Sequence, residues 1–270
     1  MRRIARGTAL ALALALCACQ SVPPLRELPA GDPRPGALLA RWSASVADRE
    51  ALRGTARLSV DAEEGDAAGE PLRVRSKQRI ALARPARLRV EVQGLLGTTL
   101  AVLAVDDGEY AFFESDSRHF ESGPVHDFLL WDMVRLELSP AQAVEVILGA
   151  PLIAADHAVL GAWDAGAGVV RIWLGGELSR RERALDLDAD ARLVRLAQWE
   201  GGHEPAWVAR FEDYALVAGA PVAHRVTLEM RSGTRAVVSL SDVELNPTLA
   251  PDIFRLDRIA PVAAPAGEGG

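Results

Sequence analysis

Two cysteines, Cys17 and Cys19, are the only thiols in this 270-residue chain, and both stand at the end of a short apolar run. Thiols can form disulfides, bind metals or act as nucleophiles. Here a stub with Arg2, Arg3 and Arg6 precedes the run, and a charged stub before a short apolar run is typical of a secretory signal. The run is shorter than the roughly 20 residues that a membrane-spanning helix needs. The cysteines therefore indicate processing and modification rather than a catalytic thiol.

The residues from Leu16 to Cys19 resemble a bacterial lipobox, in which a leucine and two small residues precede the cysteine that receives lipid. Cys17 fits this pattern poorly, because bulky Leu16 would take a small residue's place. Gln20 follows, and in such lipoproteins a residue other than Asp there permits sorting to the outer membrane. We expect loss of residues 1–18 and lipid attachment at Cys19, on an outer-membrane protein that faces the periplasm. The alternative is an ordinary secretory signal cleaved near the same position.

No other group of residues has the spacing of a catalytic or metal site. The five histidines form no H-x-x-x-H pair, and no G-x-S-x-G elbow precedes a helix. Gly166 and Gly168 open an expected strand rather than a helix, unlike a dinucleotide-binding loop. The alternating acids at 186, 188 and 190 lack the glycine and the distal glutamate of a calcium loop. We expect a binding protein rather than an enzyme, with no cofactor and no metal site.

The composition excludes some partners and permits a large core. A formal net charge of −7 argues against nucleic acid, because phosphates attract clustered cations. Apolar residues make up 49% of the chain, which is ample for a core. Residues 19–37 are rich in proline and are predicted to be an extended, lipid-anchored tether.

The hydrophobic pattern predicts a mainly β protein. Leu38, Trp42 and Val46 recur at helical spacing and indicate one amphipathic helix, but from Leu52 onward apolar residues alternate with polar ones. Four alternating cations, at 73, 75, 77 and 79, are interpreted as a solvated outer face, with a binding patch as the alternative. Residues 139–151 carry the start and stop signals of a further helix.

We expect eleven to thirteen strands and two or three helices, with no linker between them. A single antiparallel sheet of that size must curl. The predicted fold is therefore an incomplete, half-open β-barrel with a helical lid over residues 38–258, followed by a flexible tail at 259–270.

Three segments, 92–100, 138–151 and 207–214, resemble the LolB-type outer-membrane lipoprotein receptor and, more loosely, the LolA-like carriers of the same superfamily. They hold their order and spacing across residues 52–245. The resemblance implies an apolar cavity for acyl chains beneath the lid. Residues 246–256 extend beyond the LolB-type pattern and resemble the closing segment of other LolA-fold proteins.

The first of these segments contains the loop that, in the family, protrudes and presents a leucine that helps to place lipid in the membrane. That position is Leu96 here, next to Leu95. Gly94 and Leu95 replace the Asn-Pro of the family. The alternative is a hairpin whose two leucines fold back onto the core.

The strand faces and expected helices indicate which residues are candidates for the cavity wall. These are Val90, Val92, Leu103, Val105, Trp131, Met133, Ile147, Trp173 and Trp199. Tryptophan and methionine suit a pocket for flexible chains, because both give apolar area without demanding one shape.

The leading functional hypothesis is a monomeric lipoprotein that receives acylated lipoproteins from a LolA-like periplasmic carrier and inserts them into the inner leaflet of the outer membrane. One alternative is a carrier or sensor of free lipid or glycolipid on the same fold. The other is a structural envelope lipoprotein with a closed, dry core.

Overall fold

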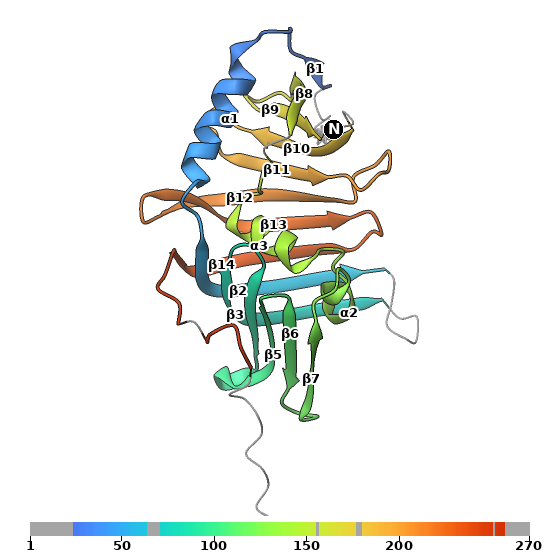
Figure 1. The fold of residues 1–270 in the computed structure, drawn as a ribbon, viewed down its shortest axis with the longest axis vertical. Coiled ribbons are helices and arrows are strands. Elements are labelled where there is room, and N and C mark those ends of the chain that lie inside the picture. The colour runs from blue at the N-terminus through green and yellow to red at the C-terminus, as the bar shows by residue number, and fades with distance from the viewer. Residues whose placement is uncertain (1–23, 64–70, 155–156, 177–179, 251, 257–270) are drawn as a thin grey trace, which may run out of the picture.

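The structure is a computed structural model that describes residues 24–63, 71–154, 157–176, 180–250 and 252–256 (Figure 1). The predicted signal, the predicted lipid-attachment residue Cys19 and the predicted tail lie outside the described residues.

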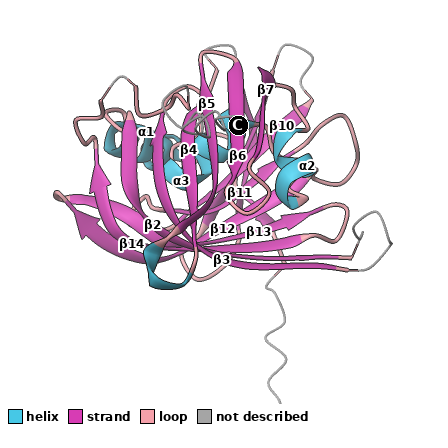
Figure 2. Ribbon diagram, turned by 90° about the horizontal axis from the view of Figure 1, so that it is seen from below, coloured by secondary structure: helices cyan, strands magenta, loops and turns pink. Residues whose placement is uncertain are grey.

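One antiparallel sheet of 14 strands makes up most of the described chain. Its spatial order is β1-β8-β9-β10-β11-β12-β13-β14-β2-β3-β4-β5-β6-β7. The edge strands β1 and β7 do not pair with each other, so the sheet stays open, and it curves around the helices (Figure 2). The strands are β1 (Arg26–Glu27), β2 (Ala51–Ala62), β3 (Leu72–Ala83), β4 (Arg87–Gln93), β5 (Thr99–Asp106), β6 (Glu109–Glu114), β7 (His119–Pro124), β8 (Ala158–Asp164), β9 (Val170–Gly175), β10 (Arg181–Leu187), β11 (Leu193–Gln198), β12 (Trp207–Val217), β13 (Ala220–Met230) and β14 (Arg235–Leu245).

The predicted single curled antiparallel sheet with helices on one side is thus confirmed. Its basis is the alternation from Leu52 onward, which places Leu52, Ala56 and Val60 on the inner face. β2 and β3 pair along their whole length, from Ala51 opposite Ala83 to Ala62 opposite Leu72. A shift of one residue would turn the apolar face outward, so burial fixes the register.

Within the described residues, three α-helices lie on the inner face of the sheet: α1 (Pro33–Val46), α2 (Leu129–Val134) and α3 (Pro140–Leu148) (Figure 2). The boundaries of α3 follow the predicted signals. The Ser139 hydroxyl accepts from the Gln142 backbone N–H, the Gln142 side chain accepts from the Ser139 N–H, and Gly149 ends the helix in the left-handed region. The helix therefore begins and ends where its own capping residues allow.

The folded part begins earlier than we expected. β1 pairs with β8, and α1 begins at Pro33, so β1 and the start of α1 lie within the segment predicted as a tether. The Asp32 carboxylate accepts from the Arg34 backbone N–H at 2.9 Å, and proline at the first helical position is already set for the helix. The prolines of this segment thus partly serve to start a helix.

The segment after β14 crosses the outer face of the sheet. Phe254 is buried against Ala51, Ala81 and Ala83, while Leu256 covers an alanine and a valine of β5. The Arg89 guanidinium donates to the Ile253 carbonyl at 3.0 Å. These contacts cover an apolar patch of the outer face that would otherwise be exposed to solvent.

Candidate functional site

An apolar cavity of about 300 Å³ lies between the sheet and the two shorter helices. Such a volume is at the lower end of the range for ligand pockets, roughly 300–1,000 Å³. Gln78 is the single polar residue among those that line it within the described chain. The lining residues are Ala56, Leu58, Gln78, Ile80, Leu82, Leu88, Val90, Val92, Ala101, Leu103, Phe112, Leu130, Met133, Val134, Leu136, Leu138, Ala143, Val146, Ile147, Leu228 and Val238.

The wall of this cavity is a patch of neighbouring inner-face residues. Ile80 on β3 stands opposite Val90 on β4, which stands opposite Leu103 on β5. Because side chains alternate between faces, these three residues point the same way. Gln78, one pair further along β3, donates from its amide to the Ser76 hydroxyl at 3.0 Å.

The roof of the cavity consists of α2, α3 and the residues between them. Met133 and Ile147 contribute from the two helices, and Leu136 and Leu138 from the connection. α2 is only six residues long and ends at Arg135, which adopts the left-handed region. A helix this short depends on packing for its stability.

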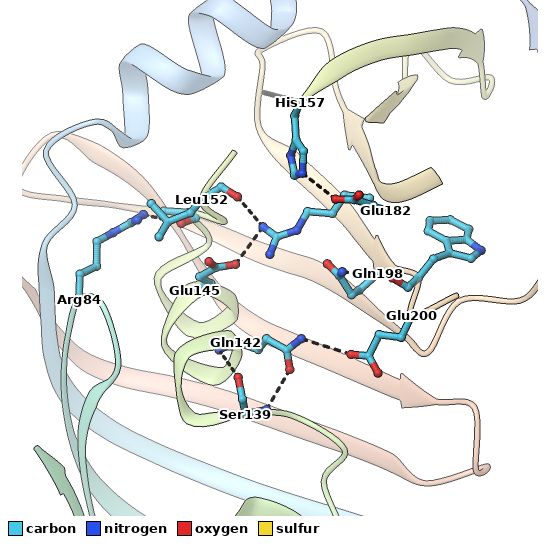
Figure 3. A network of polar contacts seen from close by, with 12 residues as sticks. Arg84, Ser139, Gln142, Glu145, Leu152, His157, Glu182, Gln198 and Glu200 are labelled. Carbon is cyan, nitrogen blue, oxygen red and sulfur yellow. Dashed lines mark hydrogen bonds and ion pairs between the residues drawn. The ribbon is translucent and has the colours of Figure 1, made fainter. Parts of the chain in front are cut away.

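Arginines hold the C-terminal end of α3 to the rest of the molecule (Figure 3). Arg49, Arg84 and Arg183 donate to the backbone carbonyls of residues 148, 150 and 152 respectively. Arg183 also pairs with Glu145 on α3 at 3.0 Å, and both side chains are largely buried. Burial lowers the pKa of the Arg49 guanidinium from its usual value. This end of the roof is therefore fixed by charged hydrogen bonds, whereas α2 lacks such bonds to the sheet among the described residues.

Further polar contacts join the same region to strand β10 and to the residues that follow β11 (Figure 3). His157 lies 2.8 Å from the Glu182 carboxylate, and the Gln142 amide donates to Glu200 at 3.5 Å. None of these four residues lines the cavity. They serve to position α3 and the segment that follows it.

The loop between β4 and β5 presents the two predicted leucines to solvent. Its residues Leu95–Gly97 form a short 3₁₀ turn, η1, in which Leu95 is 91% exposed and Leu96 is fully exposed. Leu96 has a φ of 65°, which is unfavourable for a residue with a side chain. The Gly94 N–H donates to the Thr98 carbonyl at 2.8 Å and closes the loop. The structure does not fold these leucines back onto the core.

The predicted cavity residues divide into two groups. Five of them line the cavity: Val90, Val92, Leu103, Met133 and Ile147. Val105 is buried in the adjoining core, and Trp131 on α2 lies beneath the Arg135 guanidinium instead. Neither of these two residues lines the cavity.

Trp173 and Trp199 lie on the opposite face of the sheet. Their rings are 5.4 Å apart, and the Arg181 guanidinium covers Trp173 at 3.6 Å. Because Ile172 and Leu174 point inward, Trp173 between them must point outward. β9 is apolar on both faces at this point, so its sequence pattern does not distinguish them.

Sequence reasoning missed much of the lining. The missed residues include Ile80 and Leu82, which alternate along β3 as the predicted Val90 and Val92 alternate along β4. The signal that identifies them is strand pairing, because β3 lies beside β4 on the inner face. Among the described residues, no cluster of His, Cys, Asp and Glu suits a metal ion. None of the described helices has the length and apolar character needed to cross a membrane.

Comparison with known proteins identifies the fold. No family model matches the sequence, and no curated protein matches it. Among solved structures, the chain is similar to a LolA superfamily protein from Nitrosomonas europaea, with a TM-score of 0.54 and 12% identity over 83% of this chain and 98% of that one. It is also similar to a DUF1329 family protein from Desulfovibrio piger, with a TM-score of 0.53 and 10% identity over 83% and 98% of the two chains. The chain therefore has a LolA-like fold.

Proposed function

We propose that this protein is an envelope lipoprotein, anchored at Cys19, that binds acyl chains in the cavity under α2 and α3. The observation that carries the proposal is the lining of the cavity, in which Gln78 is the single polar residue within the described chain. Each methylene buried there contributes about 0.8 kcal/mol, so a few methylenes suffice for useful affinity. No covalent step or cofactor is needed.

The more specific proposal is a receptor of the LolB type. It receives acylated lipoproteins from a LolA-like carrier and passes them to the inner leaflet of the outer membrane. The exposed Leu95 and Leu96 support this proposal, because an apolar pair at a loop tip gains free energy by entering a bilayer. In a loop tip that stays in water, two exposed leucines would provide no such gain in free energy.

The second candidate is a carrier or sensor of free lipid on the same fold. The observation that favours it is the closing segment, whose Phe254 packs against the outer face in a stretch that runs beyond the LolB-type pattern. In that case Leu96 is dispensable and no protein donor is required.

Acyl binding is tested with the full chain carrying Cys19→Ser, freed of lipid and titrated with a fluorescent fatty acid. Val90→Trp fills the cavity and is expected to weaken binding at least tenfold. Val159→Trp is the matched control, since Val159 is exposed on β8. Equal binding by the three forms, or no binding by any of them, would contradict the proposal.

Transfer is tested separately, with a complex of a LolA-like carrier and a lipoprotein as donor and vesicles as acceptor. The receptor proposal expects the lipoprotein to move to this protein and then into the vesicles. Leu96→Glu is expected to block the second step only, and Leu216→Glu, at another exposed leucine, is expected to leave it intact. Fatty-acid binding without any transfer of lipoprotein would support the free-lipid carrier instead.

A further inference from the structure

The outer face of the sheet carries a row of polar residues that runs straight toward the η1 loop. Arg225 on β13 stands opposite Ser239 on β14, Ser239 opposite Arg57 on β2, and Arg57 opposite Lys77 on β3. We call these four residues the cationic row. Their four strands lie side by side in Figure 1. Directly opposed residues of antiparallel strands point to the same face, about 5 Å apart.

Two of the three cations in this row, Arg57 and Lys77, are not balanced by a carboxylate of the described residues. Arg57 and Lys77 are both exposed and stand opposite each other, and neither forms an ion pair with a carboxylate of the described residues. Like charges directly opposite each other in a sheet are destabilising. At the other end of the row, Arg225 lies 3.4 Å from Glu212. The chain as a whole is acidic, with a net charge of −7, so this concentration of cations is not a general property of its surface.

A shallow depression of about 550 Å³ lies along the row. Arg57, Arg75, Lys77 and Arg225 line it together with Ser59 and Ser239, and no carboxylate belongs to its lining. Guanidinium groups bind phosphate oxygens through two parallel hydrogen bonds, and a lysine ammonium binds them as a point charge. Arg75 itself pairs with Asp61 at 3.0 Å, which leaves Arg57 and Lys77 as the available cations.

The row ends at the exposed leucine loop. Lys77 stands opposite Gln93, the last residue of β4, and the loop with Leu95 and Leu96 follows immediately. A cationic surface beside an apolar loop tip is the combination that binds a membrane with negatively charged lipids, because the cations attract headgroups while the tip enters the acyl region. An acidic partner protein would pair with the cations, but it would leave Leu95 and Leu96 exposed to water.

We propose that the cationic row binds the phosphates of anionic lipid headgroups and orients this outer face against the membrane while the η1 loop inserts. This role is separate from acyl binding in the cavity, which lies on the inner face. It assigns to the cations at 57 and 77 a function in membrane docking.

The test measures flotation of the full chain carrying Cys19→Ser with vesicles of phosphatidylcholine, alone or mixed with phosphatidylglycerol. Arg57→Gln with Lys77→Gln is expected to lower partitioning into the mixed vesicles roughly tenfold to thirtyfold at low salt. Arg26→Gln with Arg180→Gln removes the same charge from exposed residues at the other end of the sheet and is expected to change partitioning less than threefold. Binding to phosphatidylcholine alone is expected to be equal in all forms.

Two results would overturn the proposal. One is equal partitioning of the Arg57→Gln, Lys77→Gln form and its control into the anionic vesicles. The other is the absence of vesicle binding together with binding of polyglutamate that requires Arg57 and Lys77, which would assign the row to an acidic protein. Fatty-acid titration of the same variants separates this test from that of the cavity, since the row does not contact the cavity.

Discussion

The two ends of the sheet are built on the same alternating pattern, yet one is solidly packed and the other encloses a cavity. At the end made by β9–β11, Ile172, Leu185 and Leu196 are completely buried beneath α1. At the end made by β3–β6, Val90 and Phe112 are only half-buried, because they face the cavity. The alternation specifies an apolar inner face in both places, but what covers that face decides whether it is filled.

The covering helices differ in length and in how they are held. α1 has 14 residues and inserts Trp42, which is 2% exposed, into the inner side of the sheet. α2 has six residues and α3 has nine, and arginines from distant parts of the described chain bond to the end of α3 but not to α2. A long helix with a large side chain gives a dry core, whereas two short helices leave space. The difference shows that the cavity arises from incomplete covering of the inner face by the helices.

The largest expected effect on stability comes from removing the Trp42 side chain at the packed end of the sheet. Trp42→Ala is expected to reduce the free energy of unfolding by about 3–5 kcal/mol, since it leaves a cavity in a filled core. The matched change at the cavity end, Phe112→Ala, is expected to cost less than half as much, because Phe112 already borders space. Urea denaturation of the two variants provides the measurement. Equal losses would show that the two ends are equally well packed.

Breaking the buried ion pair at the end of α3 tests how the roof is held. Arg183→Met leaves Glu145 without its partner and frees the carbonyl of residue 152, and is expected to cost about 2–4 kcal/mol. Arg183→Met combined with Glu145→Leu is expected to restore much of the loss, because no buried charge remains. Thermal unfolding of both forms measures the difference. A double variant that is no more stable than the single one would contradict this account.

The smallest expected effect concerns the polar residue in the cavity. Gln78→Leu removes one hydrogen bond to Ser76 and is expected to change the free energy of unfolding by less than about 1 kcal/mol. Alkane binding is expected to rise a few-fold, since the cavity becomes entirely apolar. Binding of a fatty-acid ester is expected to fall if the Gln78 amide holds its carbonyl. Titration with both ligands distinguishes these effects, and unchanged binding of both would mean that Gln78 has no role in recognition.

Local sequence signals predicted those features that depend on local structure. The start of α3 at Ser139 and its end at Gly149 were predictable, because helix capping depends on residues within one turn. The sheet was predictable because alternation is a property of each strand. Trp173 was assigned to the wrong face because β9 is apolar on both faces there. Contacts with residues of other strands determine which of the two faces lines the interior. The extent of the cavity wall was not predictable for a similar reason, since it depends on which strands become neighbours.

One pairing in the middle of the sheet has a consequence for how the chain reaches its fold. β14 pairs with β2, for example through Arg235 opposite Asp61, so two segments far apart in sequence form the centre of the sheet. Contacts of this kind close a long loop and slow folding, whereas β2–β7 form a series of neighbouring hairpins. Until β14 arrives, one edge of β2 has unpaired backbone groups that attract other strands. A nascent chain is therefore most prone to aggregation before β14 has been synthesised.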